Sequence, residues 1–450
     1  MASAFTILNL PYGIVSTHSN PQLRQAIAYE EYAIDLSTLA SLSTFSHLPS
    51  FDTNVLQQVS ANISRLPSRQ HKHSSNSARS EIISDHAQTS WNSFAALPSS
   101  TRQAFRATLQ AYLRKDSTTF RDESIFIPLS SVTMHRPFDT YNYSDFYCSY
   151  EHAKNCSDIF NFKITPTWYT LPQVYNGRTS SLAISGTPIH RPCGIFPVSS
   201  NAQATFQAET KLDFELEMGV WISNAVPRGQ RLDISRAKDH IFGITLLNDW
   251  SARSIQFYEM QPLGPFHSKG SLTSISPWIV PIEALDDVAL CSRHYKQDPV
   301  PLPHLLQRGA DSEATWDIHV KASLIRDGKE YTMSQSNLNE LHWTPLQQIT
   351  HLASAGEGLS PGDVFGTGTI SSSRTNEKGE KTGLSCIWER QLENARLSTL
   401  PHDLHESLLK DGDEVVMTAW CENKSGEVVL GFGECRGKVL PAVEVSSHEK

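Results

Sequence analysis

The stretch KLDFELEM at residues 211–218 alternates polar and apolar side chains, and this pattern predicts a β-strand. Alternation with a period of two places Asp213, Glu215 and Glu217 on one face and the apolar residues between them on the other. Three acids on one side of a strand are usually a solvated face. This run, however, lies among strongly apolar neighbours, where like charges held together need a cation. Carboxylate oxygens favour Mg²⁺, Ca²⁺ or Mn²⁺ over zinc or copper.

A second acid follows an apolar run in IFGITLLNDWSARSIQ, residues 241–256. The apolar run predicts a strand that ends at Asp249, where a helix can start with this aspartate as its cap. On such a helix Arg253, Gln256 and Met260 share the face of Asp249. A carboxylate, a guanidinium and a carboxamide in a row can hold a metal and an anionic oxygen together. The alternative is a helix cap with a surface charge pair.

A third acid lies in YNYSDFYCSYEHAKNC, residues 141–156. Asp145 and His152 are seven residues apart, so they share a face if the segment is helical. A lone histidine is more often structural than catalytic, so this pair alone is a weak signal for function.

The rest of the chain indicates two domains. From about residue 125, short β-like runs such as SPWIVPI and DEVVMTAWC alternate with Gly, Pro, Asn and Asp turns, which predicts a mostly antiparallel β domain with a few helices. Residues 1–40 look strand-rich, and residues 84–115 have the apolar spacing of a helix. The Ser-rich residues 68–80 between them predict a mobile loop. We therefore expect an N-terminal domain over residues 1–124 and a catalytic domain over 125–450.

Composition and charge exclude several classes of protein. The chain has 39% hydrophobic and 19% charged residues and a net charge of -9, which argues against nucleic acid or an anionic membrane as partner. No run approaches the roughly 18 apolar residues of a membrane span, and the N-terminus lacks the pattern of a signal peptide. The seven cysteines form no Cys-x-x-Cys pair, which suggests neither a zinc site nor a disulfide framework. We expect a cytoplasmic enzyme.

Together these segments resemble a known family, the fumarylacetoacetases. The resemblance is carried by SDFYxSxxHA (144–153), SGTPIxRPxG (185–194), DxELEM (213–218), NDWSARxIQ (248–256), PLGPFxxK (262–269), SPWxVP (276–281) and GFGxCxGKVLPA (431–442). The motifs run in the family's order over nearly the whole chain, so their joint match is far more specific than any single pattern.

This resemblance implies a fold and a reaction. The fold is a small N-terminal SH3-like barrel followed by a larger mixed β-roll domain, mainly β with some α, assembled as a homodimer. The reaction is hydrolysis of a carbon–carbon bond in a β-diketo acid, the last step of tyrosine and phenylalanine breakdown. Such an enzyme acts on a small-molecule β-dicarbonyl with Mg²⁺ or Ca²⁺ as cofactor.

The resemblance also implies site residues. Asp145, Glu215, Glu217 and Asp249 match the family's metal carboxylates, and His152 matches the base that activates water. Arg253, Gln256 and Lys269 match the groups that stabilise the oxyanion or enolate. Tyr147, Tyr175 and Thr369 match positions that contact the substrate. These types suit the chemistry, because hydrolytic C–C cleavage needs an activated water and two anions stabilised in turn.

Four positions depart from the family pattern. The catalytic glutamate expected three residues before the tryptophan of the segment LSCIW (384–388) is Ser385. Asn161 stands where the family pattern has an arginine, nine residues after the base histidine. Met260 stands in place of a tyrosine, and Leu272 in place of a glycine. Serine has no charge to orient an imidazole, and losing an orienting carboxylate of this kind can cost about 10⁴ in rate. Glu377, Glu380 and Glu389 are nearby acids that can substitute for it.

Three interpretations therefore remain open. The first is a metal-dependent hydrolase acting on a β-dicarbonyl or acylpyruvate-type compound other than fumarylacetoacetate itself. The second is a diverged biosynthetic paralogue that uses the same site for enolate chemistry, namely decarboxylation, tautomerisation or C–C bond formation. Ser385 and Asn161 favour it, because stabilising an enolate requires no activated water. The third is a non-catalytic relative, against which the retained acids, His152 and Lys269 argue.

Overall fold

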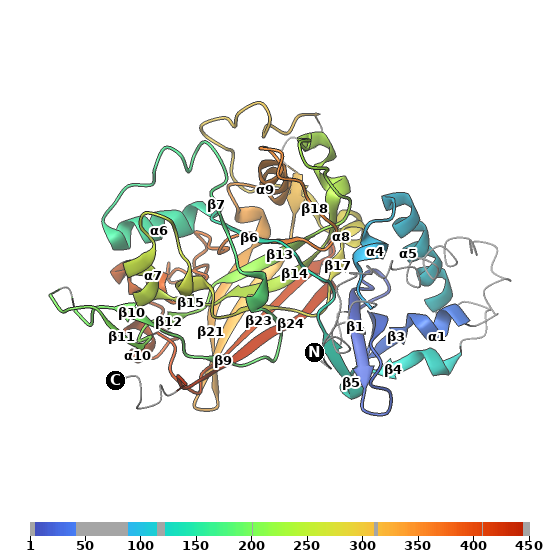
Figure 1. The fold of residues 1–450 in the computed structure, drawn as a ribbon, viewed down its shortest axis with the longest axis horizontal. Helices are drawn as coiled ribbons and strands as arrows, with labels where there is room; N and C mark the ends of the chain where they lie inside the picture. The colour runs from blue at the N-terminus through green and yellow to red at the C-terminus, as the bar shows by residue number, and fades with distance from the viewer. Residues whose placement is uncertain are drawn as a thin grey trace, which may run out of the picture.

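The computed structural model describes residues 5–41, 89–114, 122–199, 201–309, 314–406 and 408–443. Within these residues the fold is mainly β with several helices, as the sequence predicts. The N-terminal sheet and its helices lie beside a larger unit that holds the remaining sheets (Figure 1). The loop expected over residues 68–80 lies outside the described residues.

A five-stranded antiparallel sheet forms the N-terminal unit, in the strand order β4-β3-β2-β1-β5. Its strands are β1 (Tyr12–Thr17), β2 (Arg24–Tyr29), β3 (Tyr32–Asp35), β4 (Phe126–Pro128) and β5 (Val132–His135). Residues 5–8, which belong to the stretch that looks strand-rich in the sequence, form no strand. Because β4 and β5 follow residue 124, this sheet extends past the boundary that the sequence suggested. We propose that the N-terminal unit ends between residues 135 and 143.

Short helices pack on this sheet: α1 (Leu36–Ser41), α4 (Asn92–Ala95) and α5 (Ser99–Leu113). The apolar spacing predicted helix here, and Phe94 and Phe105 are both buried, with ring centroids 5.2 Å apart. The same cluster includes Tyr12 of β1 and Phe242 of the larger unit, whose rings lie 5.3 Å apart. The two units therefore share one hydrophobic core.

Two sheets build the larger unit. The first has eight strands, whose order is β7-β6-β22-β13-β14-β16-β8 with β17 paired to β14. Its strands are β6 (Tyr143–Phe146), β7 (Val174–Asn176), β8 (Leu182–Ile184), β13 (Leu216–Ile222), β14 (Ile241–Asp249), β16 (Thr273–Ile275), β17 (Val280–Pro281) and β22 (Val364–Gly366). The second has the order β21-β20-β23-β24-β9. Its strands are β9 (Ile189–His190), β20 (His319–Arg326), β21 (Lys329–Asn337), β23 (Glu414–Glu422) and β24 (Val428–Leu440).

Smaller elements complete this unit. Three two-stranded sheets pair β10 (Cys193–Phe196) with β11 (Thr205–Ala208), β12 (Leu212–Asp213) with β15 (Ser251–Ala252), and β18 (Leu290–Ser292) with β19 (Ala314–Trp316). The helices are α6 (Tyr150–Phe160), α7 (Arg253–Glu259), α8 (Ile282–Val288), α9 (Pro345–Leu352) and α10 (Asp403–Glu406). Most strand pairs are antiparallel, as predicted, while β22–β6, β16–β8 and β24–β9 are parallel.

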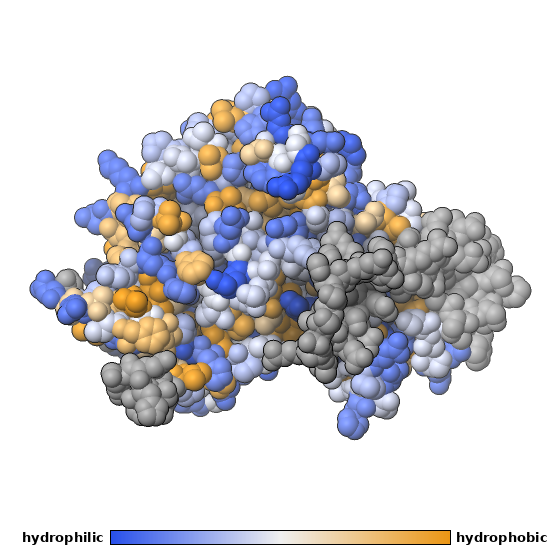
Figure 2. All heavy atoms as spheres, in the orientation of Figure 1, coloured by the Kyte–Doolittle hydropathy of each residue, from blue (hydrophilic) through white to orange (hydrophobic). Residues whose placement is uncertain are grey.

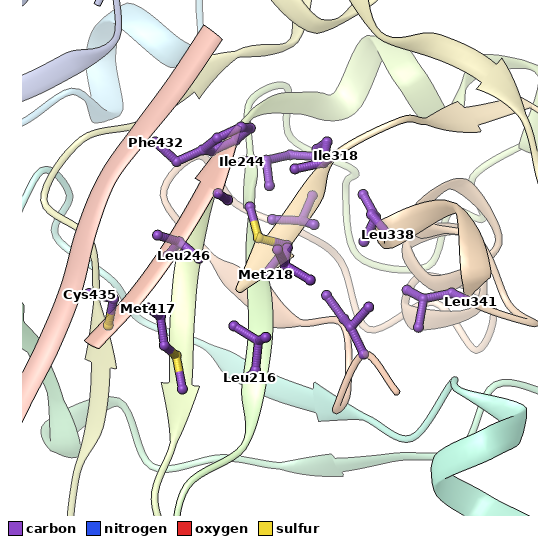
Figure 3. Packing of buried hydrophobic residues seen from close by; sticks show 14 of the residues in the cluster. Leu216, Met218, Ile244, Leu246, Ile318, Leu338, Leu341, Met417, Phe432 and Cys435 are labelled. Atoms are coloured by element: carbon purple, nitrogen blue, oxygen red, sulfur yellow. The ribbon is translucent and has the colours of Figure 1, made fainter. Parts of the chain in front are cut away.

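The two faces of β13 contact two different cores. Leu216 and Met218 pack with residues of β14, β23 and β24 in the main core (Figure 3). Glu217 points to the opposite side of the strand, the side on which Trp221 joins the core shared with the N-terminal unit. This alternation brings acidic side chains to one end of a sheet that is covered on both faces.

Two local arrangements that the sequence left open do not form. Residues 141–156 are not one helix, because Asp145 lies on β6 and His152 on α6. Asp249 is not a helix cap, since it ends β14 and α7 begins only at Arg253. The pairing of β12 with β15 explains why the helix begins later in the sequence, because it keeps the chain extended beyond Asp249.

The surface mixes residue types. Hydrophilic and hydrophobic residues are interspersed over the face drawn in Figure 2. No helix among the described residues is long and apolar enough to cross a membrane.

Candidate active site

Three buried carboxylates meet where neighbouring strands of the large sheet end. Asp145 comes from β6, Glu217 from β13 and Asp249 from β14, and each offers an oxygen within 4.8 Å of the others. All three side chains are at most 1% exposed. Burial raises the pKa of Glu217 well above its ordinary value, and repulsion from Asp145 and Asp249 raises it further. A divalent cation at this point would relieve both effects.

The surroundings of this cluster also suit a cation. One oxygen each of Asp145 and Asp249 is buried without a hydrogen-bond partner among the described residues. The Tyr175 hydroxyl donates to the other oxygen of both, each at 3.0 Å, and the Gly368 amide donates to Glu217 at 2.9 Å. The free oxygens are therefore fixed in position and available as metal ligands.

Gly366 of β22 makes room for the cluster. It pairs with Asp145 on one side and with Gly219 of β13 on the other. A Cβ atom at Gly366 would lie 2.4 Å from Asp145 Oδ1 and 2.7 Å from Glu217 Oε2. Only glycine leaves the space that the two carboxylates occupy.

Glu215 lies beside the cluster and is held by cations. Arg253 Nη1 is 2.8 Å from Glu215 Oε1, and Lys269 Nζ is 2.5 Å from Glu215 Oε2. Lys269 also contacts Asp249 directly. Burial alone would raise the pKa of Glu215, but the charges of Lys269 and Arg253 outweigh it and hold this pKa well below its ordinary value. Gln256 accepts from Arg253 Nη1 at 3.1 Å, so the predicted anion-stabilising groups lie together.

Asp213 belongs to this site, although the sequence indicated no role for it beyond a shared strand face. Its Oδ2 accepts from Arg253 Nε at 3.0 Å and from Nη2 at 2.8 Å. It also accepts from the backbone amides of Ile387 and Trp388, each at 2.9 Å. Asp213 therefore fixes the guanidinium and ties it to the segment that follows residue 386. The sequence signal for this role of Asp213 is its spacing of two residues from Glu215.

His152 faces two carboxylates. Its Nδ1 lies 3.1 Å from Glu389 Oε2, and its Nε2 lies 3.9 Å from Glu215 Oε1. Ser149 caps α6 by accepting from the His152 amide at 3.1 Å, which fixes the histidine in the first turn. The ring therefore presents Nε2 to the cavity with a negative charge behind it.

Glu389, an acid considered from the sequence, supplies a carboxylate beside His152. It follows Trp388 in a short 3₁₀ helix and is fully buried. Asn155 Nδ2 donates to its Oε1 at 2.8 Å and Ser371 Oγ to its Oε2 at 2.6 Å. Burial alone would raise the pKa of Glu389, but the His152 charge and these hydrogen bonds lower it to about 2. Of the three acids considered from the sequence, Glu389 is therefore the one that lies beside His152.

Ser385 does not occupy that position beside the imidazole. Its hydroxyl donates to the Ile370 carbonyl at 2.6 Å and lies 3.0 Å from the Ser334 hydroxyl. Glu380, another acid considered from sequence, bonds instead to Asn376 and Ser398.

Two thiols flank the His152–Glu389 pair. Cys156 Sγ lies 3.7 Å from His152 Nε2, and Cys386 Sγ donates to Glu389 Oε2 at 3.3 Å. Burial raises the pKa of Cys386 well above its ordinary value, and the neighbouring Glu389 adds to this. Cys386 is therefore a neutral hydrogen-bond donor to the carboxylate.

One cavity of about 670 Å³ joins these groups. Ten of the eleven predicted site residues line it, namely Asp145, Tyr147, His152, Tyr175, Glu215, Asp249, Arg253, Gln256, Lys269 and Thr369. Glu217 lies behind this lining, within the carboxylate cluster. Residues from sequence positions 145 to 369 thus converge on one hollow.

Two of the three other unusual positions lie away from this cavity. Asn161 ends α6 in the left-handed conformation, with φ 53° and ψ 43°, and is exposed. Leu272 packs against the main core. Met260 does line the cavity.

The chain is similar to known proteins along its length. A family model described as fumarylacetoacetase N-terminal matches residues 8–137, and one described as fumarylacetoacetate (FAA) hydrolase C-terminal matches residues 142–440. Proteins named fumarylacetoacetase from Rattus norvegicus and Homo sapiens are 37% and 36% identical, each over 98% of this chain and 97% of the relative. The Arabidopsis thaliana protein of that name is 35% identical over 98% of this chain and 96% of its own. A solved fumarylacetoacetate hydrolase from Exiguobacterium antarcticum gives a TM-score of 0.48 at 14% identity, covering 96% of this chain and 99% of that one.

Proposed function

We propose that this chain, which belongs to the fumarylacetoacetase family, is a metal-dependent hydrolase that cleaves a carbon–carbon bond in a β-diketo acid. The chain is a hydrolase of ketonic C–C bonds whose substrate is similar to fumarylacetoacetate, and its family belongs to tyrosine and phenylalanine catabolism. The observation that carries the mechanism is His152 between Glu389 and Glu215, in the cavity that the carboxylates line.

In this mechanism the unprotonated form of His152 is the general base. Burial alone would lower the pKa of His152, but Cys156 and Glu389 raise it well above its ordinary value, so this form becomes more abundant as the pH rises. Glu389 orients the imidazole through Nδ1, so that Nε2 can take a proton from a water molecule in the cavity. The resulting hydroxide adds to a substrate carbonyl, and the oxyanion then collapses as the C–C bond breaks. The departing enolate takes up a proton to become a ketone. Tyr147, Tyr175 and Thr369 are proposed to contact the substrate.

The anionic stages need cations, and the chain provides them. Arg253, Gln256 and Lys269 are proposed to stabilise the oxyanion and the enolate, because they lie together beside Glu215. Asp145, Glu215, Glu217 and Asp249 would hold Mg²⁺ or Ca²⁺. When bound, such an ion supplies Lewis-acid stabilisation of the diketone oxygens.

The test is an assay of purified protein with Mg²⁺ and acylpyruvates, followed by loss of the diketone absorbance. Glu389→Gln should lower kcat by about 10²–10⁴, because the amide cannot hold the imidazole with a negative charge. Ser385→Ala is the matched control, and it should keep wild-type kcat. Full activity in Glu389→Gln would contradict the base assignment, and full activity in Glu217→Gln would contradict the metal assignment.

Enolate chemistry without an activated water is the second candidate function. Asn161 still favours it, because an uncharged, exposed helix-ending residue stands where the family pattern has an arginine. Ser385 no longer favours this second function, since Glu389 lies beside His152 and can orient it. Incubation in H₂¹⁸O separates the two functions. Hydrolysis places ¹⁸O in the carboxylate product, whereas decarboxylation or tautomerisation does not.

We further propose that the enzyme is a cytoplasmic homodimer that binds neither nucleic acid nor membrane. All seven cysteines are unpaired, which supports a reducing compartment. Sedimentation equilibrium should give twice the mass of the chain, and a single-chain mass at micromolar concentration would contradict the dimer.

A further inference from the structure

The outer part of the catalytic cavity is lined by apolar side chains. We call this part the apolar arm and define it by Phe160, Phe162, Phe257, Met260, Leu263 and Trp388. It draws residues from the end of α6, from α7 and the turn after it, and from the 3₁₀ helix that carries Glu389.

The rings of the apolar arm pack against each other. The centroid of Phe160 lies 4.5 Å from that of Phe257, 5.7 Å from that of Phe162 and 6.0 Å from that of Trp388. Yet Phe257 and Phe162 remain 55% and 52% exposed. The arm is therefore a preformed wall with aromatic surface left for a ligand to cover.

The apolar arm continues directly from the catalytic groups. Helix α7 carries Arg253 and Gln256 at its start, and Phe257 follows Gln256 immediately. Trp388 precedes Glu389, the partner of His152. A substrate whose diketone reaches the carboxylates would extend its far end along this wall.

No lining cation among the described residues is free to take a carboxylate there. Arg253 is paired with Asp213 and Glu215, and Lys269 with Glu215 and Asp249. His152 faces Glu389 and Glu215. Burial lowers the pKa of His351, and nearby His304 lowers it further, so His351 is neutral. A substrate carboxylate in the arm would lose hydration without gaining an ion pair.

One more cation lies behind the wall. Lys211 Nζ lies 5.5 Å from the centroid of the Trp388 ring and lines a neighbouring cavity. It does not line the cavity of about 670 Å³, although Arg253, Phe160, Phe257 and Trp388 line both cavities.

We propose that the apolar arm binds the acyl end of the substrate, and that this end is an uncharged aromatic or alkyl group rather than a carboxylate. The inference rests on the proposed function and narrows its substrate to aroyl- or alkanoyl-pyruvates. The polar diketo acid would lie at the carboxylates and the acyl tail along Phe257 and Trp388.

A matched pair of substrates tests this proposal. Benzoylpyruvate and 4-carboxybenzoylpyruvate differ only by a carboxylate at the end of the ring. We expect kcat/KM to be at least about tenfold higher for benzoylpyruvate, since burying an unpaired charge is costly. Straight-chain acylpyruvates should gain up to about fourfold per buried methylene until the arm is filled. Equal or better turnover of the carboxylated compound would overturn the proposal.

Variants locate the effect on the arm. Phe257→Ala should lower kcat/KM for benzoylpyruvate by about tenfold, and by less for acetylpyruvate, which is too short to cover the ring. Phe206→Ala is the matched control, because Phe206 is 60% exposed and lines neither cavity. Met260→Arg should improve turnover of the carboxylated compound by supplying the missing cation. Equal loss in Phe257→Ala and Phe206→Ala would contradict the assignment.

Two further results separate this inference from the proposed function. If the wild type turns over no diketone with Mg²⁺ present, the proposed function fails. If it turns over dicarboxylic substrates best, only the inference on the acyl end fails. Loss of a carboxylate preference in Lys211→Met would assign the far end to the neighbouring cavity and overturn the proposal.

Discussion

At the scale of single residues, where a carboxylate lies in the folded structure decides its role more than where it stands in a sequence motif. Glu389 comes four residues after Ser385, yet its carboxylate lies 3.1 Å from His152. Donors from Asn155 and Ser371 hold it there. The carboxylate beside His152 therefore comes from the residue that follows Trp388 in the sequence. The hydroxyl of Ser385 bonds to Ser334 and Ile370 instead.

The lowered pKa of Glu389 makes a prediction for stability against pH. Its folded pKa is about 2 against an ordinary 4.5, so ionised Glu389 stabilises the fold above about pH 4.5. That contribution, about 3 kcal/mol at most, is lost as pH falls from 4.5 towards 2. In urea unfolding, the wild type should exceed Glu389→Gln in stability at pH 5, and the difference should shrink by pH 3. A difference that is constant with pH would contradict this charge state.

Replacing Asp213 should lower the catalytic rate but leave metal binding nearly unchanged. Asp213→Asn removes the charge that holds Arg253 by two hydrogen bonds. We expect kcat to fall about tenfold to 100-fold, as for loss of one charged hydrogen bond of roughly 1.5–3 kcal/mol. Because Asp213 is outside the carboxylate cluster, Mg²⁺ affinity measured by calorimetry should change little. Glu217→Gln is the comparison, and it should lose Mg²⁺ binding. Equal loss of Mg²⁺ binding in both variants would make Asp213 a ligand instead.

At the scale of elements, β22 is the spacer that lets β6 and β13 bring their acids together. Gly366→Ala would place a Cβ within 2.4 Å of Asp145 Oδ1, so the carboxylates must separate. We expect at least a tenfold weaker Mg²⁺ affinity by calorimetry, about 1.4 kcal/mol. Gly219→Ala is the control on the paired strand, since its nearest neighbours would be the side chains of Thr245, Leu247 and Val364, at 3.2, 3.4 and 3.6 Å. Similar losses in the two variants would mean a general effect on the sheet.

The same scale shows what could be predicted from the sequence. The alternation in residues 211–218 correctly predicted that Glu215 and Glu217 face away from the apolar core, because a strand's period is local. It did not predict that the strand is interrupted at residues 214–215, between β12 and β13. The possible helix start at Asp249 does not occur, and the sequence could not exclude it, since pairing of β12 with β15 is a contact between residues some 40 apart in sequence. Glu389 could only be offered as one of three acids, because its place beside His152 depends on how two distant segments pack.

At the scale of the whole molecule, the catalytic sheet is buried on both faces. Leu216 and Met218 contact one core, and Trp221 and Phe242 contact the core shared with the N-terminal unit. The sequence predicted the fold class and two units, yet not this sharing, because residues 12 and 242 reveal no contact until both are folded. The N-terminal unit therefore supports the sheet that carries the carboxylates, and stability and catalysis should be linked.

That link makes the last prediction. Phe242 of β14 is 1% exposed and lies between rings from both units, with centroids 5.3 Å from Tyr12 and 5.3 Å from Phe138. Phe242→Ala should cost about 3–5 kcal/mol of unfolding free energy through the cavity it leaves. Hydrogen exchange should show reduced protection in the N-terminal strands as well as in β14, because the core is common to both. Phe206→Ala, at 60% exposure, should change neither. Loss of protection in the larger unit alone would mean that the two units fold independently, and that the N-terminal sheet does not stabilise the site.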